Sequence, residues 1–193
     1  MSLTGNLESL SERGWKSTRC GGFTLIELMI TITLGAIIMG IGVPSYQDFV
    51  VKNRIQTQAS EIRSSLAMAR VEAIRRGLRV RVCPGQGRCV GANWHGGWNS
   101  FVDRNSDNTR DAGLNETQLE VHIRLDGGST LTGANNVIFK SDGTAVRART
   151  LILCTADGDA SPHRRGIHVS NVGRVRVCGP PAAGEPACPI ACP

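Results

Sequence analysis

Aromatic side chains are scarce in this sequence, with three Trp, four Phe and one Tyr among 193 residues. Together with 23 glycines, this scarcity predicts a loop-rich sheet module with a modest core. No Gly-x-Ser-x-Gly stretch occurs and the His residues are scattered, so no nucleophile lies beside an activating base. The nearest candidate cluster is His163 with Asp157 and Asp159. We therefore expect no enzyme, no catalytic residue, no metal site and no cofactor.

The length and charge of the chain set broad limits. A chain of 193 residues suffices for one compact domain and an extension, but is short for two full domains. Its formal charge is +6; the first 22 residues carry three basic and two acidic side chains, which leaves +5 for the remainder. This excess permits binding to nucleic acid or to an anionic surface without proving either.

The segment from Phe23 to Val43 is apolar apart from Glu27. As a helix rising about 1.5 Å per residue it spans roughly 30 Å, the hydrocarbon thickness of a bilayer. A secretory signal has its small cleavage residues after the apolar stretch. Here Gly21 and Gly22 precede it, so a cut after Gly22 removes a polar leader and keeps the membrane helix. The basic leader predicts a cytoplasmic N-terminus, with the bulk of the chain outside.

Glu27 is the one charge in this apolar segment. A carboxylate within the membrane is costly unless it is paired. After cleavage, the new α-amine of Phe23 is a candidate partner, on the same chain or on a neighbouring subunit. Pairing with a neighbour would set the register of an assembly; the alternative is a carboxylate that reaches the membrane interface.

Hydrophobic periodicity outlines the rest of the fold. From Ile55 to Ala73 the apolar residues step by three and four, which predicts an amphipathic helix that ends at Gly77. The period then changes to two, and strands separated by Gly- and Asn-containing turns are expected at 78–82, 98–102, 119–125, 136–140, 150–155, 166–170 and 174–178.

These elements predict an α+β fold, in which a long N-terminal helix packs on an antiparallel β-sheet head. The expected domains are the leader at 1–22, the helix at 23–77 with its membrane half at 23–43, the head at 78–178, and a Pro- and Cys-rich tail at 179–193.

Seven cysteines are many for a reduced cytosolic protein, and Cys20 lies in the leader. The other six form an even set, which in an exported domain indicates disulfides. Zinc is the alternative, but Cys83 and Cys89 have five residues between them, more than the two to four of a zinc finger. The best candidate pairs are Cys154 with Cys178, joining a strand to the final hairpin, and Cys83 with Cys89, closing the loop after the first strand.

The expected final hairpin is rich in arginine. Alternation points Arg174 and Arg176 outward, about 7 Å apart, comparable to successive phosphates along a DNA strand. Arg164 and Arg165 enlarge the patch. No aromatic residue is interleaved, so any binding is expected to be led by phosphates and independent of sequence. The same alternation turns the hairpin's apolar side chains to the core: Ile167, Val169, Val175 and Val177.

Two patterns have a simpler interpretation. The pentapeptide Arg-Val-Arg-Val-Cys occurs at both 79–83 and 174–178, so the arginines of the hairpin could be an ordinary solvated strand face. The run Asp103-x-Asn105-x-Asp107-x-x-x-Asp111 is similar to a calcium loop, but it lacks the glycine at its sixth position and the acid at its twelfth. A solvated Asp/Asn turn is therefore the expectation.

The stretch Gly22-Phe23-Thr24-Leu25-Ile26-Glu27-Leu28 resembles the prepilin peptidase site of type IV pilins and type II secretion pseudopilins. The resemblance implies cleavage between Gly22 and Phe23, N-methylation of Phe23, and a role for Glu27 in filament assembly. Pro44 falls where such pilins often carry a helix-bending proline.

The order of later features resembles the GspH/FimT family of minor pilins and pseudopilins, from Cys20 to Cys178. The helix ending in Gly77 leads into a strand ending at Cys83, and a Gly-Trp strand, a late cysteine strand and a Gly-Arg-x-Arg strand follow. In the competence branch of that family, Gly-Arg-x-Arg contacts DNA. Here the motif is matched by Gly173, Arg174 and Arg176, with Val175 between the arginines.

The resemblance implies a minor pilin at or near the tip of a type IV pilus, which binds DNA for uptake in natural transformation. The alternatives are a minor pseudopilin of type II secretion, which contacts exported proteins, and a priming subunit without DNA binding. Expected partners are other pilins, the prepilin peptidase, the inner membrane and DNA. The precursor is expected in the inner membrane, and the mature subunit in a pilus or pseudopilus in the periplasm or at the cell surface.

Overall fold

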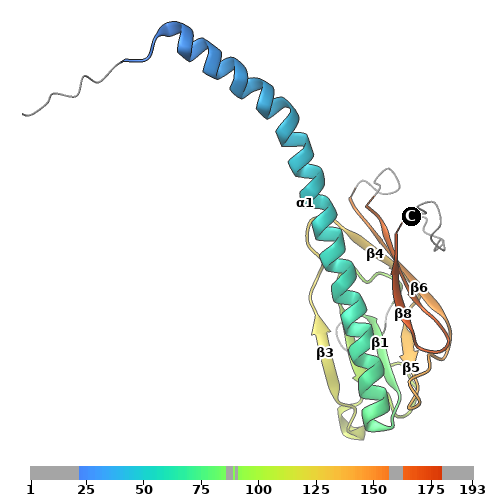
Figure 1. The fold of residues 1–193 in the computed structure, drawn as a ribbon. Helices are drawn as coiled ribbons and strands as arrows, with labels where there is room; N and C mark the ends of the chain where they lie inside the picture. The colour runs from blue at the N-terminus through green and yellow to red at the C-terminus, as the bar shows by residue number, and fades with distance from the viewer. Residues whose placement is uncertain (1–21, 86–88, 90, 157–162, 180–193) are drawn as a thin grey trace, which may run out of the picture. The chain divides into compact units, whose positions relative to one another are not determined.

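The computed structural model describes residues 22–85, 89, 91–156 and 163–179. The chain divides into two compact units, Met1–Pro44 and Ser45–Pro193. Helix α1 (Leu25–Arg76) runs through both, with Pro44 inside it (Figure 1).

In the first unit, Thr24 caps the start of α1. The Glu27 amide donates to the Thr24 hydroxyl oxygen at 3.2 Å, so one of the unpaired N–H groups at the helix end is satisfied. The Thr31 and Thr33 hydroxyls donate to backbone carbonyls one turn earlier, at 2.9 and 2.7 Å. Among the described residues, α1 is the one helix long and apolar enough to cross a membrane, with a mean hydropathy of 2.1 in its best window.

In the second unit, α1 presents one buried stripe to the head, as its periodicity predicts. The stripe consists of Ile55, Gln58, Ala59, Ile62, Ser65, Leu66, Ala69 and Ala73. The helix ends at Arg76, and Gly77 takes the left-handed conformation with φ of 65°. The Gly77 and Leu78 amides donate back to carbonyls of the last turn, each at 3.3 Å. The predicted glycine stop is thereby confirmed.

The head contains two four-stranded antiparallel sheets. The first has the order β3-β2-β1-β5 and the second β4-β6-β7-β8. The bounds are β1 (Val80–Pro84), β2 (Trp98–Val102), β3 (Gln118–His122), β4 (Thr130–Gly133), β5 (Val137–Phe139), β6 (Arg149–Cys154), β7 (Arg165–Val169) and β8 (Val175–Cys178), with a short 3₁₀ turn, η1 (Ala112–Leu114). Strand β4 was not predicted, and β3 ends before the expected residue 125.

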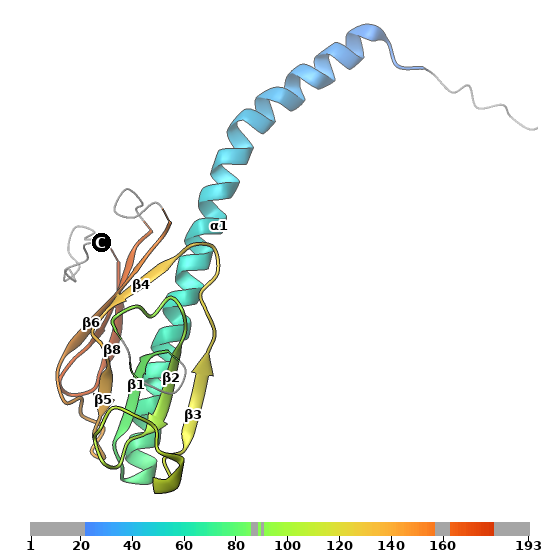
Figure 2. The same cartoon turned by 180° about the vertical axis from the view of Figure 1, so that it is seen from behind.

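One core joins the helix stripe to both sheets. Its largest members are Trp94 and Trp98, which pack with buried aliphatic residues of α1, β4, β6 and β7. The Trp94 indole N–H donates to the Ala134 carbonyl at 2.8 Å, so its polar atom is satisfied. Within the head, β3 lies to one side of α1 and β6 and β8 to the other in both views (Figures 1 and 2). The predicted α+β architecture is confirmed, with two sheets where one was expected.

Candidate nucleic-acid interface

The predicted arginine hairpin is formed by β7 and β8. Its register pairs His168 with Thr150 on one side and with Arg176 on the other. The Thr150 hydroxyl oxygen and His168 Nδ1 lie 3.0 Å apart. These three side chains therefore form a row on one face of the sheet, and the opposite face carries the buried residue Val169.

Arg174 and Arg176 are both exposed, and within the described part of the chain neither guanidinium has a hydrogen bond or an ion pair. The identical pentapeptide at 79–83 behaves differently. Arg81 is 2% exposed, and its Nε donates to a carboxylate oxygen of Asp103 at 2.6 Å. The same pentapeptide thus contains a buried arginine paired with a carboxylate in β1, Arg81. At β8 it contains two exposed arginines without such a partner, Arg174 and Arg176.

Gly173, the first residue of the Gly-Arg-x-Arg motif, has a structural role. It is buried with φ of 75°, and an added Cβ would collide with the carbonyl oxygen of Gly143. Arg70 on α1 holds both turns: it donates to the Gly143 carbonyl at 2.9 Å and to the Val172 carbonyl at 3.2 Å. No local pattern in the sequence indicates this role of Arg70, because its two partners lie 73 and 102 residues away.

Arg165 differs from the expectation of a single patch. It occupies the same sheet face as Ile167, opposite to that of Arg176, and lines a groove with Arg63 of α1 and Val177. It therefore does not extend the outer row. Val177 was expected in the core but is 37% exposed, because it lies along this groove. Arg164 is half-buried.

Basic residues are concentrated in the second half of the head. Residues 78–126 carry six Arg and six Asp or Glu, which cancel. Residues 127–179 carry seven Arg or Lys and three Asp, so 7 − 3 gives +4. All four strands of the hairpin's sheet lie in this second stretch. The positive excess of the head therefore gathers around the sheet that carries the hairpin.

A second Arg-x-Arg pair, Arg147-Ala148-Arg149, lies at the start of β6. Its spacing repeats that of Arg174 and Arg176, although no function was expected for it from the sequence. The register places Arg149 opposite Val169, which is itself opposite Val175. The two arginine pairs therefore lie at the same end of the sheet.

A disulfide joins Cys83 to Cys89, with the Cα atoms 5.2 Å apart. This is the pair expected to close the loop after the first strand. It lies at the end of β1, in the other sheet from the hairpin.

The expected pairing of Cys154 with Cys178 is wrong. Both residues are disulfide-bonded, but β7 lies between β6, which ends at Cys154, and β8, which ends at Cys178. Two strand spacings are about 9.5 Å, more than the roughly 7 Å between Cα atoms that a disulfide can bridge. The chain order of the strands did not reveal which strand would lie in the middle.

The loop that was compared with a calcium site uses its carboxylates internally. Asp103 accepts the Ser106 amide at 2.7 Å and pairs with Arg81. Asp107 and Asp111 both accept the Asn105 amide nitrogen, at 2.9 and 3.1 Å. These bonds form the expected Asp/Asn turn, but Asp103 is buried and not solvated as expected.

His163 has a partner that the sequence did not suggest. Its Nε2 lies 2.6 Å from Asp48 Oδ1 on α1. The two aspartates expected beside it, Asp157 and Asp159, fall outside the described residues.

The residues expected at the processing site, and Glu27, lie at the start of α1. Gly22 and Phe23 precede the helix and are exposed, and Glu27 lies in its first turn. In the described part of the chain, the Glu27 carboxylate makes no hydrogen bond or ion pair; its backbone amide takes the Thr24 cap. The side chain is therefore available to a group on another subunit.

Comparison with known proteins locates similarity in both units. Residues 17–43 match the prokaryotic N-terminal methylation motif. Two fimbrial proteins of Pseudomonas aeruginosa are each 39% identical over 59 residues, or 31% of this chain. That match covers 38% of the length of each relative.

Two solved structures show the same fold. The type IV minor pilin FimU of P. aeruginosa matches with a TM-score of 0.53 at 20% identity, covering 67% of this chain and 91% of its own. The minor pseudopilin EpsH of the Vibrio cholerae type II secretion system matches with a TM-score of 0.51 at 13% identity, covering 69% of this chain and 99% of its own.

The sequence of the head matches a known protein family. Residues 58–173, which include seven of the eight strands and the buried stripe of α1 except Ile55, match the family described as type II transport protein GspH. The chain therefore belongs to the GspH family, and the methylation motif at residues 17–43, which includes the apolar part of α1, is the N-terminal signature of a pilin-like subunit.

Proposed function

We propose that this subunit is a minor pilin of a type IV pilus, placed at or near the tip, that binds DNA without sequence preference for uptake in natural transformation. The observation that carries the proposal is the exposure of Arg174 and Arg176 without a neutralising partner in the described chain. The buried, paired Arg81 shows that this chain neutralises an arginine where it serves the fold.

The electrostatics of the head support the same proposal. A net +4 over residues 127–179, against zero over 78–126, favours approach of a polyanion to the hairpin sheet. An arginine fork bonds two phosphate oxygens at once, so two outward arginines supply two phosphate contacts. The hairpin brings no aromatic residue to its outer row, which supports binding through phosphates alone.

Assembly into a filament is proposed to raise the affinity for DNA above that of a single head. The mature N-terminus at Phe23 and the carboxylate of Glu27 are the groups proposed to join neighbouring subunits. One head with two contacts binds weakly. Several heads carried on one filament raise the effective affinity, because the second binding event is intramolecular.

The salt dependence of DNA binding tests the proposal. Each phosphate contact contributes about −0.9 to the slope of log K against log salt. In the mature chain, held in a non-ionic detergent, we expect Arg174→Gln with Arg176→Gln to flatten the slope by about 1.8. Fluorescence anisotropy of a short labelled duplex, titrated at several salt concentrations, measures this.

The matched control is Arg104→Gln with Arg124→Gln. It removes the same charge from two exposed arginines in residues 78–126. We expect this variant to keep the wild-type slope. Equal slopes for the wild type and the hairpin variant, or no DNA binding at low salt, would refute DNA binding at the hairpin.

A minor pseudopilin of a type II secretion system is the second candidate. The family description and the fold of EpsH favour it. In that case the head contacts exported proteins, and both double variants leave any residual DNA binding unchanged. A priming subunit, which only nucleates a filament, would show neither DNA binding nor binding of an exported protein.

A further inference from the structure

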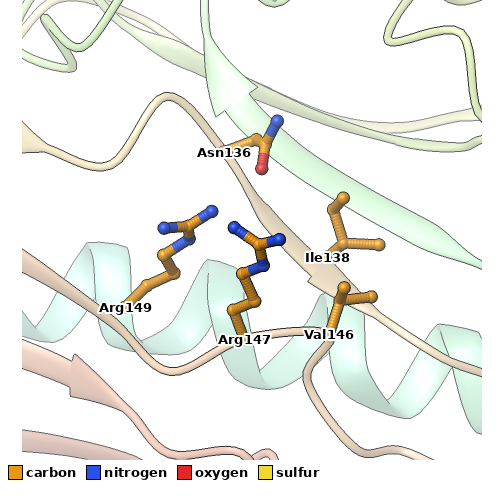
Figure 3. A pocket seen from close by; sticks show the side chains of 5 residues that line it. All are labelled: Asn136, Ile138, Val146, Arg147 and Arg149. Carbon is orange, nitrogen blue, oxygen red and sulfur yellow. The ribbon is translucent and has the colours of Figure 1, made fainter.

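A cavity of about 230 Å³ opens beside β5, at the start of β6. Asn136 and Ile138 line one wall, and Val146, Arg147 and Arg149 line the other. Figure 3 shows both guanidinium groups turned toward the Asn136 side chain. None of the motifs found in the sequence includes these residues.

Backbone pairing brings the two walls together. The Val146 amide donates to the Ile138 carbonyl at 2.9 Å, and Phe139 forms a bridge with Ala145. Three residues after Val146 the chain enters β6 at Arg149, which is paired with Val169 of β7. The arginines therefore extend from a segment held by both sheets.

The cavity carries positive charge without an internal counter-charge. No carboxylate lines it, and neither Arg147 nor Arg149 makes a hydrogen bond or ion pair with any described residue. Two neighbouring cations repel, and an anion between them removes that repulsion. Ile138 and the exposed Val146 form the apolar part of the lining.

The donors suit a phosphate. Guanidinium groups bond two oxygens of one phosphate. The Asn136 amide turns its oxygen toward the two guanidinium groups in Figure 3, and a half-turn of this amide would present its nitrogen as a neutral donor. Arg149, Val169 and Val175 follow one another across the sheet, so the cavity lies about 10 Å from the start of β8. Arg149 shares the sheet face of Val175, whereas Arg176 lies on the other face. The two arginine pairs therefore flank one end of the sheet.

We propose that the cavity between Asn136, Arg147 and Arg149 binds one phosphate group of a DNA strand that crosses this end of the sheet. The inference rests on the proposed DNA binding, and it adds a site outside the hairpin. The DNA path then includes a phosphate held in a cavity as well as those on the outer row.

The first test uses inorganic phosphate and the change Asn136→Asp. The new carboxylate is nearly isosteric and occupies the cavity as an internal anion. Wild-type protein should melt a few degrees higher in excess phosphate than in chloride of equal ionic strength. This gain should disappear in Asn136→Asp and persist in Asn135→Asp, which places the same charge on the exposed neighbouring residue. Equal gains in all three proteins reflect general salting effects and overturn the site.

The second test identifies the source of the phosphate. Arg147→Gln with Arg149→Gln should flatten the salt slope of DNA binding by about 0.9, because one phosphate is lost. If the wild type binds no DNA, the proposed function fails. If the hairpin variant alone changes the slope, DNA binding stands but the cavity takes no DNA phosphate. A response to inorganic phosphate in that case identifies a site for free phosphate and overturns the DNA assignment.

Discussion

The Nε of Arg70 on α1 donates a hydrogen bond of 2.9 Å to the carbonyl oxygen of Gly143. Its Nη2 reaches the Val172 carbonyl in the hairpin turn. Arg70→Ala should therefore lower the free energy of unfolding by about 1.5–3 kcal/mol, the range for hydrogen bonds that involve charged groups. Urea denaturation measures this. Arg63→Ala, an exposed arginine on the same helix, should change it by less than about 0.5 kcal/mol. Equal effects would contradict the role of Arg70.

Gly173→Ala should destabilise the head even though Gly173 carries no charge. The left-handed conformation costs about 1–3 kcal/mol for a residue with a side chain, and the new Cβ meets the Gly143 carbonyl. We expect thermal unfolding at a lower temperature and weaker DNA binding as a consequence of the distorted turn. Gly113→Ala is the control, because nothing lies within 4 Å of its added Cβ. Unchanged stability of Gly173→Ala would argue against the packing of this turn.

The turn beside Gly143 predicts a response to acid. The Thr144 hydroxyl, at 2.6 Å, and then the Thr144 amide lower the pKa of Asp142 from its usual 3.8. Since the folded state has the lower pKa, this stabilisation is complete above the unfolded pKa and is lost as the pH falls through the folded one. Asp142→Asn should therefore lower the melting temperature at neutral pH, with a difference that shrinks in acid. Asp126→Asn, which removes the same charge from another exposed carboxylate, is the control substitution, and a pH-independent effect of Asp142→Asn would contradict this prediction.

Peptide mapping under non-reducing conditions should recover Cys83 linked to Cys89. Cys154 and Cys178 should appear in two separate linkages, because β7 lies between their strands. In a chain cut after Gly22, the cysteines that remain are Cys188 and Cys192, so we expect each to hold one of these two partners. A peptide linking Cys154 directly to Cys178 would require a different strand order.

Glu27→Gln should leave membrane insertion intact and reduce recovery of the subunit in sheared filaments. The change removes the charge proposed to meet the Phe23 amine of a neighbour, while the Thr24 cap on the Glu27 amide remains. Quantitative immunoblots of the membrane and filament fractions measure both quantities. Thr24→Val is the converse control, because it removes the cap and keeps the carboxylate. Normal filament recovery of Glu27→Gln would count against pairing.

The sequence predicted those features that depend on local periodicity. The buried stripe of α1, the stop at Gly77 and most strands follow from spacing, because residues on one face of a helix or strand recur at fixed intervals. Strand β4 was not predicted because it has only four residues. Two of them are threonines, which flank a single buried leucine, Leu131. Such a short pattern resembles a loop.

Features that depend on strand order could not be read from the sequence. Arg81 and Arg176 have the same neighbours in the chain and opposite environments, because only Arg81 lies beside a carboxylate from an adjacent loop. The Cys154–Cys178 error has the same cause. The cavity at Arg147 and Arg149 likewise lies between β5 and the start of β6. The proximity of these two segments is a tertiary contact, which local sequence patterns do not predict.

The uneven charge of the two halves of the head has a kinetic consequence. Residues 78–126 have no net charge and residues 127–179 have a net charge of +4, so the charge distribution of the head is asymmetric. In the electric field of a polyanion, the head experiences a torque before any contact forms. This torque turns the sheet that carries the hairpin toward the polyanion. Orientation during approach raises the fraction of collisions that succeed. Salt should accordingly slow the capture of DNA more than it hastens release.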